Sequence, residues 1–305
     1  MPVREPGLGD GQALRRLWDD LGGWYRNTSP TSDTDVDRAI GRALRQAASG
    51  RRLSRRKPAE CSWVSVSDSK IIGWLFARAD PEQNYIVPLV PPEDTTGAFE
   101  SMLDPAREWF RQESARRFVV DVPTTRPDLR SVVMKGGKIL WHRAVLDRDL
   151  SPLPSTGALP ETVREFRRSD LAAAESLFRA RHPEKPPPPI PVAFLELRGG
   201  LFRDPAWEME RAVWIAGSGR NLLGVAGGNH RPRAPIGFLG PWVLAQAASP
   251  PLATSLLAAV LSWLERFGAR RVRTTTPTPP SDDAQVLLRS GFATMAESDL
   301  FEITV

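Results

Sequence analysis

The chain has 305 residues, 41% of them apolar, which is long enough for two domains that each bury a core. Its net charge of +5 arises from 41 basic and 36 acidic residues that are interleaved along the sequence, so the composition argues against a nucleic-acid-binding protein. A single cysteine excludes an internal disulfide, and the three histidines lack the spacing of a zinc site.

The sequence contains no apolar run long enough to span a membrane, and it begins without a signal peptide. We therefore expect a cytoplasmic protein without a membrane partner, a nucleic-acid partner or a bound metal. One dense basic run, Arg51–Lys57, has two interpretations. In the first interpretation the run contacts an anion such as a nucleotide or RNA. In the second, which we favour, it forms a solvated loop.

The first half of the chain predicts mixed α and β structure. A short strand, "PVRE", precedes a helix that starts near Asp10, and a further helix is expected over residues 35–48. Three strands follow, separated by turn signals: "CSWVSV", "KIIGWLFAR" and "YIVPLV". A long amphipathic helix, the strand "RRFVVDVP", a short helix and a closing pair of strands complete this half.

The second half repeats the same order of elements. "WFRQESARRFVVDVPT", from Trp109, aligns without a gap with "WLERFGARRVRTTTPT", from Trp263, and the register continues to Gly137 and Gly291. The strands "RAVWIAG", "NLLGVAGG" and "IGFLGPWVL" correspond to the three strands of the first half. This duplication predicts two homologous domains, residues 1–150 and 162–305, joined by a proline-rich linker over 151–161.

The long helix of the second half has clear boundaries in the sequence. Ser249 is a favourable N-cap, Pro250 suits the first helical position, and Gly268 stands where a left-handed C-terminal cap is expected. The apolar residues between them recur at helical spacing and predict one buried stripe, made of Leu256, Val260, Trp263, Leu264 and Phe267. We interpret this stripe as core.

The order of elements resembles that of the GNAT superfamily of acyl-CoA-dependent N-acyltransferases, in tandem and over nearly the whole chain. "LLRSGF", which ends at Gly291 and Phe292, is similar to the closing Y-x-x-x-G-F motif of the family. Residues 236–267 are similar to its acyl-CoA motif, and its two-copy members include mycothiol synthase. The resemblance implies an α/β protein with two GNAT-like domains, each a mixed, mostly antiparallel sheet flanked by helices.

In this family the fourth and fifth strands splay apart, pantetheine lies along the fourth strand, and the pyrophosphate binds N–H groups at the start of the next helix. The resemblance implies such a site in the second domain, at Trp242, Val243, Leu244, Leu252, Ala253 and Thr254. The signature Arg/Gln-x-x-Gly-x-Gly/Ala is incomplete there, because Ala248 and Pro251 replace its first two defined residues. The first domain keeps Gly97, but Asp94 and Phe99 would disfavour a pyrophosphate by charge and by bulk.

Acyl transfer to an amine needs a base and an acid. The acid of the family is commonly a tyrosine, which is absent from both copies, where Leu287 and Val133 occupy its position. As a base we consider His230, which lies between the third and fourth strands of the second copy. Glu208 and Glu210 share one side of an extended strand and would hold a water or a substrate ammonium. An inert loop histidine and a solvated strand edge are the structural alternatives.

Three functions remain open at this point. The first is an N-acyltransferase that uses acetyl-CoA or a related acyl-CoA and a small amine, with the second domain active. The second is an inactive tandem scaffold for binding or regulation, which the loss of both signatures and both tyrosines supports. The third is a GNAT-like acyl-CoA decarboxylase. We favour the first, and the sequence assigns neither the acceptor nor an oligomeric state.

Overall fold

A computed structural model describes most of the chain: residues 1–24, 40–41, 59–79, 84–92, 94–153, 162–181, 201–204, 209–218, 221–230, 234–278 and 280–305. These residues form two compact units, which differ from the two halves of the sequence. The first unit is Met1–Arg143 together with Ala296–Val305, and the second is Ala144–Met295. The end of the chain, which we expected in the second domain, thus belongs to the first unit.

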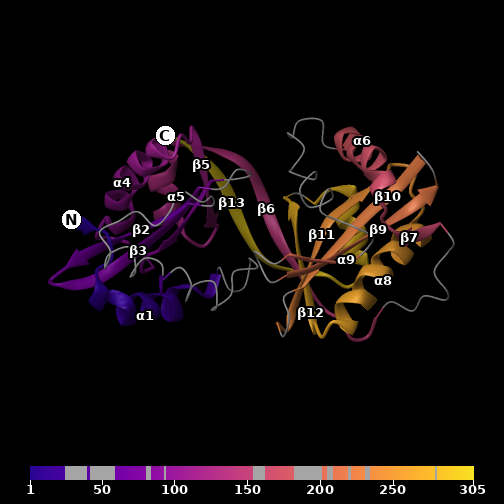
Figure 1. The fold of residues 1–305 in the computed structure, drawn as a ribbon, viewed down its shortest axis with the longest axis horizontal. Helices are drawn as coiled ribbons and strands as arrows, with labels where there is room; N and C mark the ends of the chain where they lie inside the picture. Colours follow the sequence, from indigo (N-terminus) through magenta and orange to yellow (C-terminus); the bar gives the residue numbers. More distant parts are fainter. Residues whose placement is uncertain are drawn as a thin grey trace. The chain divides into compact units, whose positions relative to one another are not determined.

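The first unit follows the predicted order. Its elements are β1 (Val3–Arg4), α1 (Gly11–Leu21), β2 (Ala59–Ser67), β3 (Lys70–Ala79), β4 (Tyr85–Leu89), α4 (Ala98–Gln112), β5 (Arg117–Pro123), α5 (Pro127–Met134) and β6 (Gly137–Asp149). Its strands lie in the order β1-β2-β3-β4-β5-β13-β6. Figure 1 shows α4 and α5 on one side of this sheet and α1 on the other, and each side has its own apolar cluster. The helix expected over 35–48 falls mostly outside the described residues.

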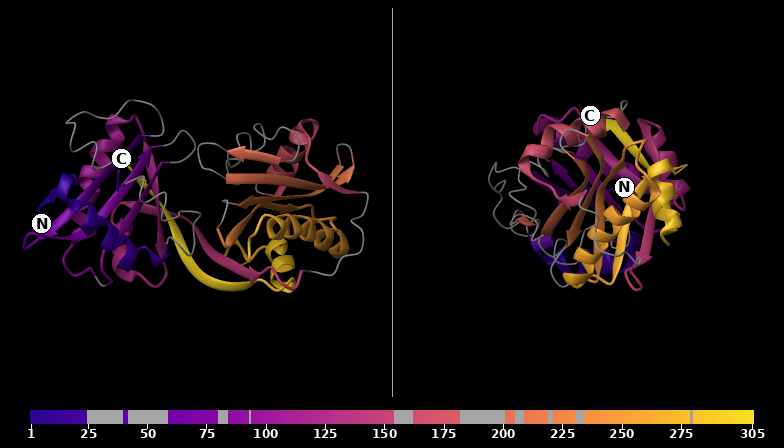
Figure 2. Two further views of the ribbon diagram at one scale, coloured as in Figure 1. Left: turned by 60° about the horizontal axis from the view of Figure 1, so that its bottom comes forward. Right: turned by 90° about the vertical axis from the view of Figure 1, so that its right-hand side faces the viewer.

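The second unit repeats this arrangement. Its elements are β7 (Val163–Glu165), α6 (Leu171–Arg181), β8 (Leu201–Asp204), β9 (Met209–Ser218), β10 (Asn221–His230), β11 (Ile236–Leu244), α8 (Pro250–Arg266), β12 (Arg271–Pro277), α9 (Asp282–Arg289) and β13 (Ala293–Thr304). The strand order is β6-β12-β11-β10-β9-β7, and β8 pairs with β9. The left view of Figure 2 shows α8 on the opposite side of the sheet from α6. The two mixed, helix-flanked sheets confirm the predicted fold class.

The two closing strands are exchanged between the units. We expected a closing pair of strands in each domain, but each half of the chain supplies one long strand, β6 or β13. The later part of β13 pairs antiparallel with β5 of the first unit, for example Phe301 opposite Val120. The later part of β6 belongs to the second unit, where the Leu150 N–H donates to the Arg270 carbonyl. Each sheet therefore contains a strand segment from the other half of the chain.

Corresponding ion pairs attach the exchanged strands. In the first unit, Arg117 lies 2.8 Å from Glu302 of β13. In the second unit Arg271, the repeat counterpart of Arg117, lies 2.7 Å from Asp147 of β6. Arg273 contacts the other oxygen of Asp147 at 2.5 Å, and both side chains are 4% exposed. The exchange is thus accompanied by an arginine–carboxylate pair in each unit.

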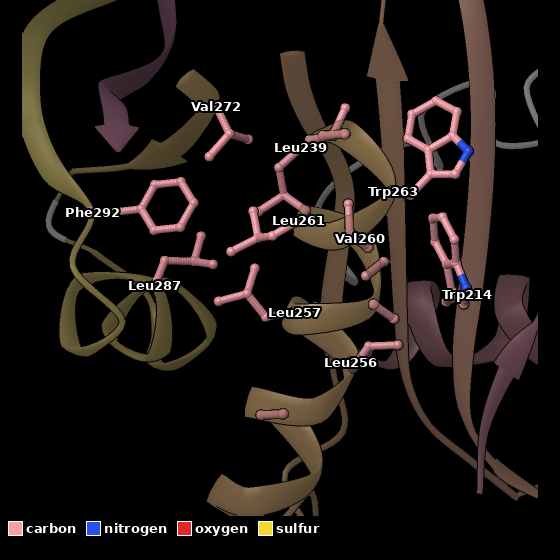
Figure 3. Packing of buried hydrophobic residues seen from close by; sticks show 14 of the residues in the cluster. Trp214, Leu239, Leu256, Leu257, Val260, Leu261, Trp263, Val272, Leu287 and Phe292 are labelled. Atoms are coloured by element: carbon pink, nitrogen blue, oxygen red, sulfur yellow. The ribbon is translucent and has the colours of Figure 1, made fainter. Parts of the chain in front are cut away.

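The predicted stripe on α8 forms the core of the second unit. Leu256, Val260 and Leu264 are fully buried, and Trp263 is 2% exposed. Figure 3 shows Trp263 beside Trp214 of β9, with ring centroids 6.0 Å apart and planes at 64°. Trp63 and Trp109 repeat this edge-on contact in the first unit, at 6.1 Å and 72°. The tryptophans at these positions are core residues, as predicted.

Candidate functional site

In both units two neighbouring parallel strands diverge. Among the described residues, β4 pairs with β5 only at Tyr85 and Ile86. Likewise, β11 pairs with β12 only over Ile236–Phe238, although β11 continues to Leu244. The later part of each strand therefore has no neighbour on its β5 or β12 side, and a helix, α4 or α8, starts a few residues further along. A strand edge next to a helix N-terminus is a candidate binding site for an extended ligand that carries an anionic group.

The start of α8 has few free hydrogen-bond donors. Ser249 is its N-cap, and two prolines follow, as the sequence predicts, but the Ser249 side chain makes no capping hydrogen bond. The Ala253 N–H already donates to the Ser249 carbonyl, at 3.0 Å. Since prolines have no N–H, Leu252 is the donor within the first turn that the helix geometry leaves unpaired.

Two of the predicted ligand-binding residues have structural roles at this helix start. Ala253 is 1% exposed and belongs to the core cluster of the second unit. The Thr254 hydroxyl donates to the Pro250 carbonyl at 3.0 Å, so it is engaged within the helix. These contacts correct the expectation that Leu252, Ala253 and Thr254 all offer free donors, because only Leu252 does so.

The start of α4 is capped by a side chain of the protein itself. Gly97, the N-cap, has a left-handed backbone with φ of 70°. The Asp94 carboxylate accepts hydrogen bonds from the N–H groups of Phe99 at 2.9 Å and of Thr96 and Ala98 at 3.2 Å. Phe99 itself is fully buried in the core, so the bulk that we expected it to place at the helix start is absent.

These hydrogen bonds fix the charge of Asp94. Burial acts to raise the pKa of the Asp94 carboxyl, but the bonds from Phe99, Thr96 and Ala98 outweigh it and hold the pKa below its ordinary value. The carboxylate is therefore ionised at neutral pH, and it occupies the N–H groups of Thr96, Ala98 and Phe99, to which an external anion would otherwise bind. Its charge disfavours an external anion at the start of α4.

This cap predicts a stability difference that depends on pH. Replacing Asp94 with asparagine should lower the free energy of unfolding by about 1 kcal/mol at pH 7, because the amide loses the negative charge at the helix start and one of the two accepting oxygens. Because the folded pKa is depressed, the advantage of aspartate is present above its unfolded pKa and is lost as the pH falls through the folded value. Urea unfolding of both proteins at pH 7 and pH 3 measures it. Asp104→Asn is the control, since that side chain is 86% exposed, and an equal effect in the control would contradict the prediction.

Comparison with known proteins identifies the fold. No family model matches the chain, and no curated protein matches it. A tandem GNAT protein from the clavulanic acid biosynthesis pathway aligns with 99% of this chain over 98% of its own, with 16% identity and a TM-score of 0.61. A GCN5-related N-acetyltransferase from Sphaerobacter thermophilus aligns with 99% of this chain over 95% of its own, with 15% identity and a TM-score of 0.66.

The chain has the tandem GNAT fold. The divergence of β11 from β12 corresponds to the strand splay that the sequence resemblance implies, and β11 occupies the place of the fourth strand in this fold. Of its predicted ligand-binding residues, Val243 pairs with Val225 of β10. The Ala245 N–H donates to the Leu223 carbonyl, so by the alternation of an antiparallel pair the backbone groups of Trp242 and Leu244 face the splay.

The second GNAT unit places a carboxylate on this edge. The Leu244 N–H donates to Asp283 Oδ2 at 3.0 Å, and the Trp242 indole N–H donates to the Asp283 carbonyl at 2.9 Å. Arg181 of α6 neutralises the carboxylate through Oδ1, at 2.9 Å. Asp283 is 6% exposed, and α9 is thereby tied to β11. An extended ligand on this edge would have to displace the carboxylate from Leu244.

The first unit has a link between its short helix and the segment that follows its fourth strand. Asp128 of α5 accepts a hydrogen bond from the Asp94 N–H at 3.2 Å. Arg126 binds Asp128 and also donates to the carbonyls of Val90, at 3.2 Å, and of Pro91, at 2.8 Å. Both splays are therefore bridged by side chains of the protein.

Neither His230 nor Glu210 is brought to the splay. His230 is 1% exposed, and its Nε2 lies 2.9 Å from the Ala234 carbonyl, so the ring is enclosed. Glu210 lies directly opposite His230 on β9 and is partly exposed. Glu208 lies outside the described residues. Since a base must reach the proton that it removes, the enclosed ring gives no support to His230 as the base, and that role stays a prediction.

Two further observations concern metal ions and membranes. No group of three or more histidine, cysteine, aspartate or glutamate side chains in the described residues is arranged to hold a metal ion. In the part of the chain that the structure describes, no helix is both long and apolar enough to cross a membrane.

Proposed function

We propose that the protein is an acyl-CoA-dependent N-acyltransferase that uses acetyl-CoA or a related acyl-CoA and a small amine, and that its second unit binds the acyl-CoA. The contrast between the two helix starts carries this proposal. The Asp94 carboxylate occupies the start of α4, whereas Ala248 replaces it in the second unit and the Leu252 N–H at the start of α8 remains unpaired. An anionic pyrophosphate is repelled at the first helix start and accepted at the second.

One observation favours a different function. Asp283 satisfies the Leu244 N–H, so the strand edge that the family uses for pantetheine already has an internal partner. Together with Pro250 and Pro251, this arrangement fits a tandem GNAT scaffold that has lost acyl transfer and serves in binding or regulation. The two functions differ in whether acyl-CoA binds and whether an acylated amine forms.

A variant of Leu252 tests the proposed site. Leu252→Pro removes the last N–H in the first turn, whereas Leu252→Ala keeps that N–H and loses the same apolar side chain. We expect the proline variant to bind acetyl-CoA at least about tenfold more weakly than the alanine variant, since hydrogen bonds to charged groups contribute about 1.5–3 kcal/mol. Isothermal titration calorimetry measures both affinities, and the shift in melting temperature is an independent check.

The outcomes separate the two functions. One acetyl-CoA per chain, with an affinity that distinguishes the two Leu252 variants, supports the proposal, and an amine panel with product analysis then identifies the acceptor. Equal affinities in both variants would place the ligand elsewhere. Failure of the unmodified protein to bind acetyl-CoA or CoA at millimolar concentration would favour the scaffold.

A further inference from the structure

Asp299 is a buried charge on the exchanged strand β13. It is 1% exposed and lies opposite Val122 of β5 in the first unit. Its Oδ1 lies 2.5 Å from Nδ1 of His142, which comes from β6, and its Oδ2 forms an ion pair with Arg130 of α5 at 2.9 Å. Both partners are about half exposed, at 53% and 42%, so the carboxylate is the only deeply buried member of this trio.

The second unit has no cation at the corresponding positions. The gap-free register that relates Gly137 to Gly291 places Ala284 at the position of Arg130. The counterpart of His142 is Ala296 in that register and Glu297 in the offset of the matching ion pairs, and neither residue is a cation. The matching ion pairs Arg117–Glu302 and Arg271–Asp147 relate β13 to the later part of β6, and they place Ala144 at the position of Asp299. Ala144 and Ala284 are 3% and 2% exposed. The fold therefore does not itself require charges at these positions.

The duplication makes two strand pairings competitive. Because the two units share one fold, the later part of β13 would also fit beside β12 of its own half, and that of β6 beside β5. In such an unexchanged pairing Glu302 would form an ion pair with Arg271, much as Asp147 does now. This ion pair therefore favours neither the exchanged nor the unexchanged pairing by much. Asp299 discriminates strongly, because beside Ala284 its carboxylate would be buried without a cation, which is costly.

We propose that Asp299 selects the exchanged pairing of the closing strands. Its carboxylate has Arg130 and His142 as partners only in the first unit, and this directs the end of the chain there rather than into the second unit. Selecting one of two otherwise similar packings is the best attested use of buried charges.

A competition between two disulfides tests this selection. The Val305 N–H donates to the Arg116 carbonyl at 3.1 Å, so Arg117 and Thr304 form the neighbouring non-hydrogen-bonded pair, with Cα atoms about 4.5 Å apart. That separation suits a disulfide. Arg271 is the repeat counterpart of Arg117, and it would face Thr304 in the unexchanged pairing.

The test protein carries Cys61→Ala, which removes the natural thiol, together with Arg117→Cys, Arg271→Cys and Thr304→Cys. Because both Arg117 and Arg271 are replaced, each of the two competing strand pairings loses one arginine–carboxylate ion pair. The substitutions themselves therefore do not bias the ratio of the two disulfides. After equilibration in a glutathione buffer, peptide mass spectrometry measures the ratio of the 117–304 to the 271–304 disulfide. With Asp299 present we expect a ratio of about a hundred or more.

Moving the carboxylate should move the strand. In Asp299→Ala/Ala144→Asp, the buried charge finds Arg130 and His142 only if β6 stays in the first unit, so we expect the 271–304 disulfide to predominate. Asp299→Ala alone leaves Arg130 and His142 solvated and should fold, with the ratio reduced to within about tenfold of one. An unchanged ratio in the single variant would overturn the proposal even if the double variant fails to fold.

Discussion

Replacing Asp147 with alanine should lower the free energy of unfolding by about 3–5 kcal/mol, one of the two largest effects that we expect of a single substitution. Asp147 holds the exchanged part of β6 in the second unit by binding Arg271 and Arg273. Arg271 is 47% exposed and would turn to water, but Arg273 is 4% exposed and would lose its Asp147 partner without gaining contact with water. We expect most of the cost to come from this buried guanidinium.

Urea unfolding, followed by far-UV circular dichroism, measures the effect of Asp147→Ala. Asp149→Ala is the matched control, because Asp149 contacts Arg271 at 3.4 Å but its side chain is 78% exposed. We expect the control to change stability by less than about 1 kcal/mol. Similar losses in the two variants would show that the burial of Arg273 is not the source of the effect.

The exchange of β6 and β13 was not predictable from the sequence because the halves are repeats. The closing strand of either half has the apolar pattern and the carboxylate that would let it pack in either unit. The Arg117–Glu302 ion pair of the first unit corresponds to the Arg271–Asp147 pair of the second. Only contacts between residues far apart in the sequence, such as Asp299 with His142, distinguish the two pairings. Local sequence patterns do not predict such long-range contacts. They did predict the apolar stripe of α8 and its caps.

The candidate site was predictable only in outline. The positions of β11 and of the α8 start follow from alternation, prolines and the Ser249 cap, and the structure confirms each of them. The sequence predicts that Asp94 disfavours an anion there, but its hydrogen bonds to the start of α4 require the backbone geometry around Gly97. Asp283 lies in the first turn of α9, and its carboxylate reaches the Leu244 N–H on β11, a contact that no local sequence pattern reveals.

His230 shows why residue type alone is a weak guide to a base. A histidine in a loop between two strands has a suitable ordinary pKa, and the sequence contains only three histidines. In the structure it ends β10, is enclosed, and contacts the Ala234 carbonyl. Exposure and reach decide catalytic competence, and both are tertiary properties.

The second large effect is expected for replacement of Trp263. This variant distinguishes effects on the core of the second unit from effects on its proposed ligand site. Trp263→Ala removes a ring that contacts Trp214 and Phe267, with centroids 6.0 Å and 4.8 Å away. We expect a loss of about 3–5 kcal/mol, because the surrounding side chains fill the cavity only in part. Differential scanning calorimetry should show a correspondingly lower melting temperature.

The same variant should leave the affinity of the folded protein for acetyl-CoA unchanged. Leu252 and Trp263 lie on the same helix, separated by about 16 Å at 1.5 Å per residue, and the N–H at the helix start does not depend on the ring. Titration well below the melting temperature measures this affinity. A tenfold loss of affinity with Trp263→Ala, alongside an unaffected Leu252→Pro, would mean that the tryptophan stripe contacts the ligand and that the helix start does not.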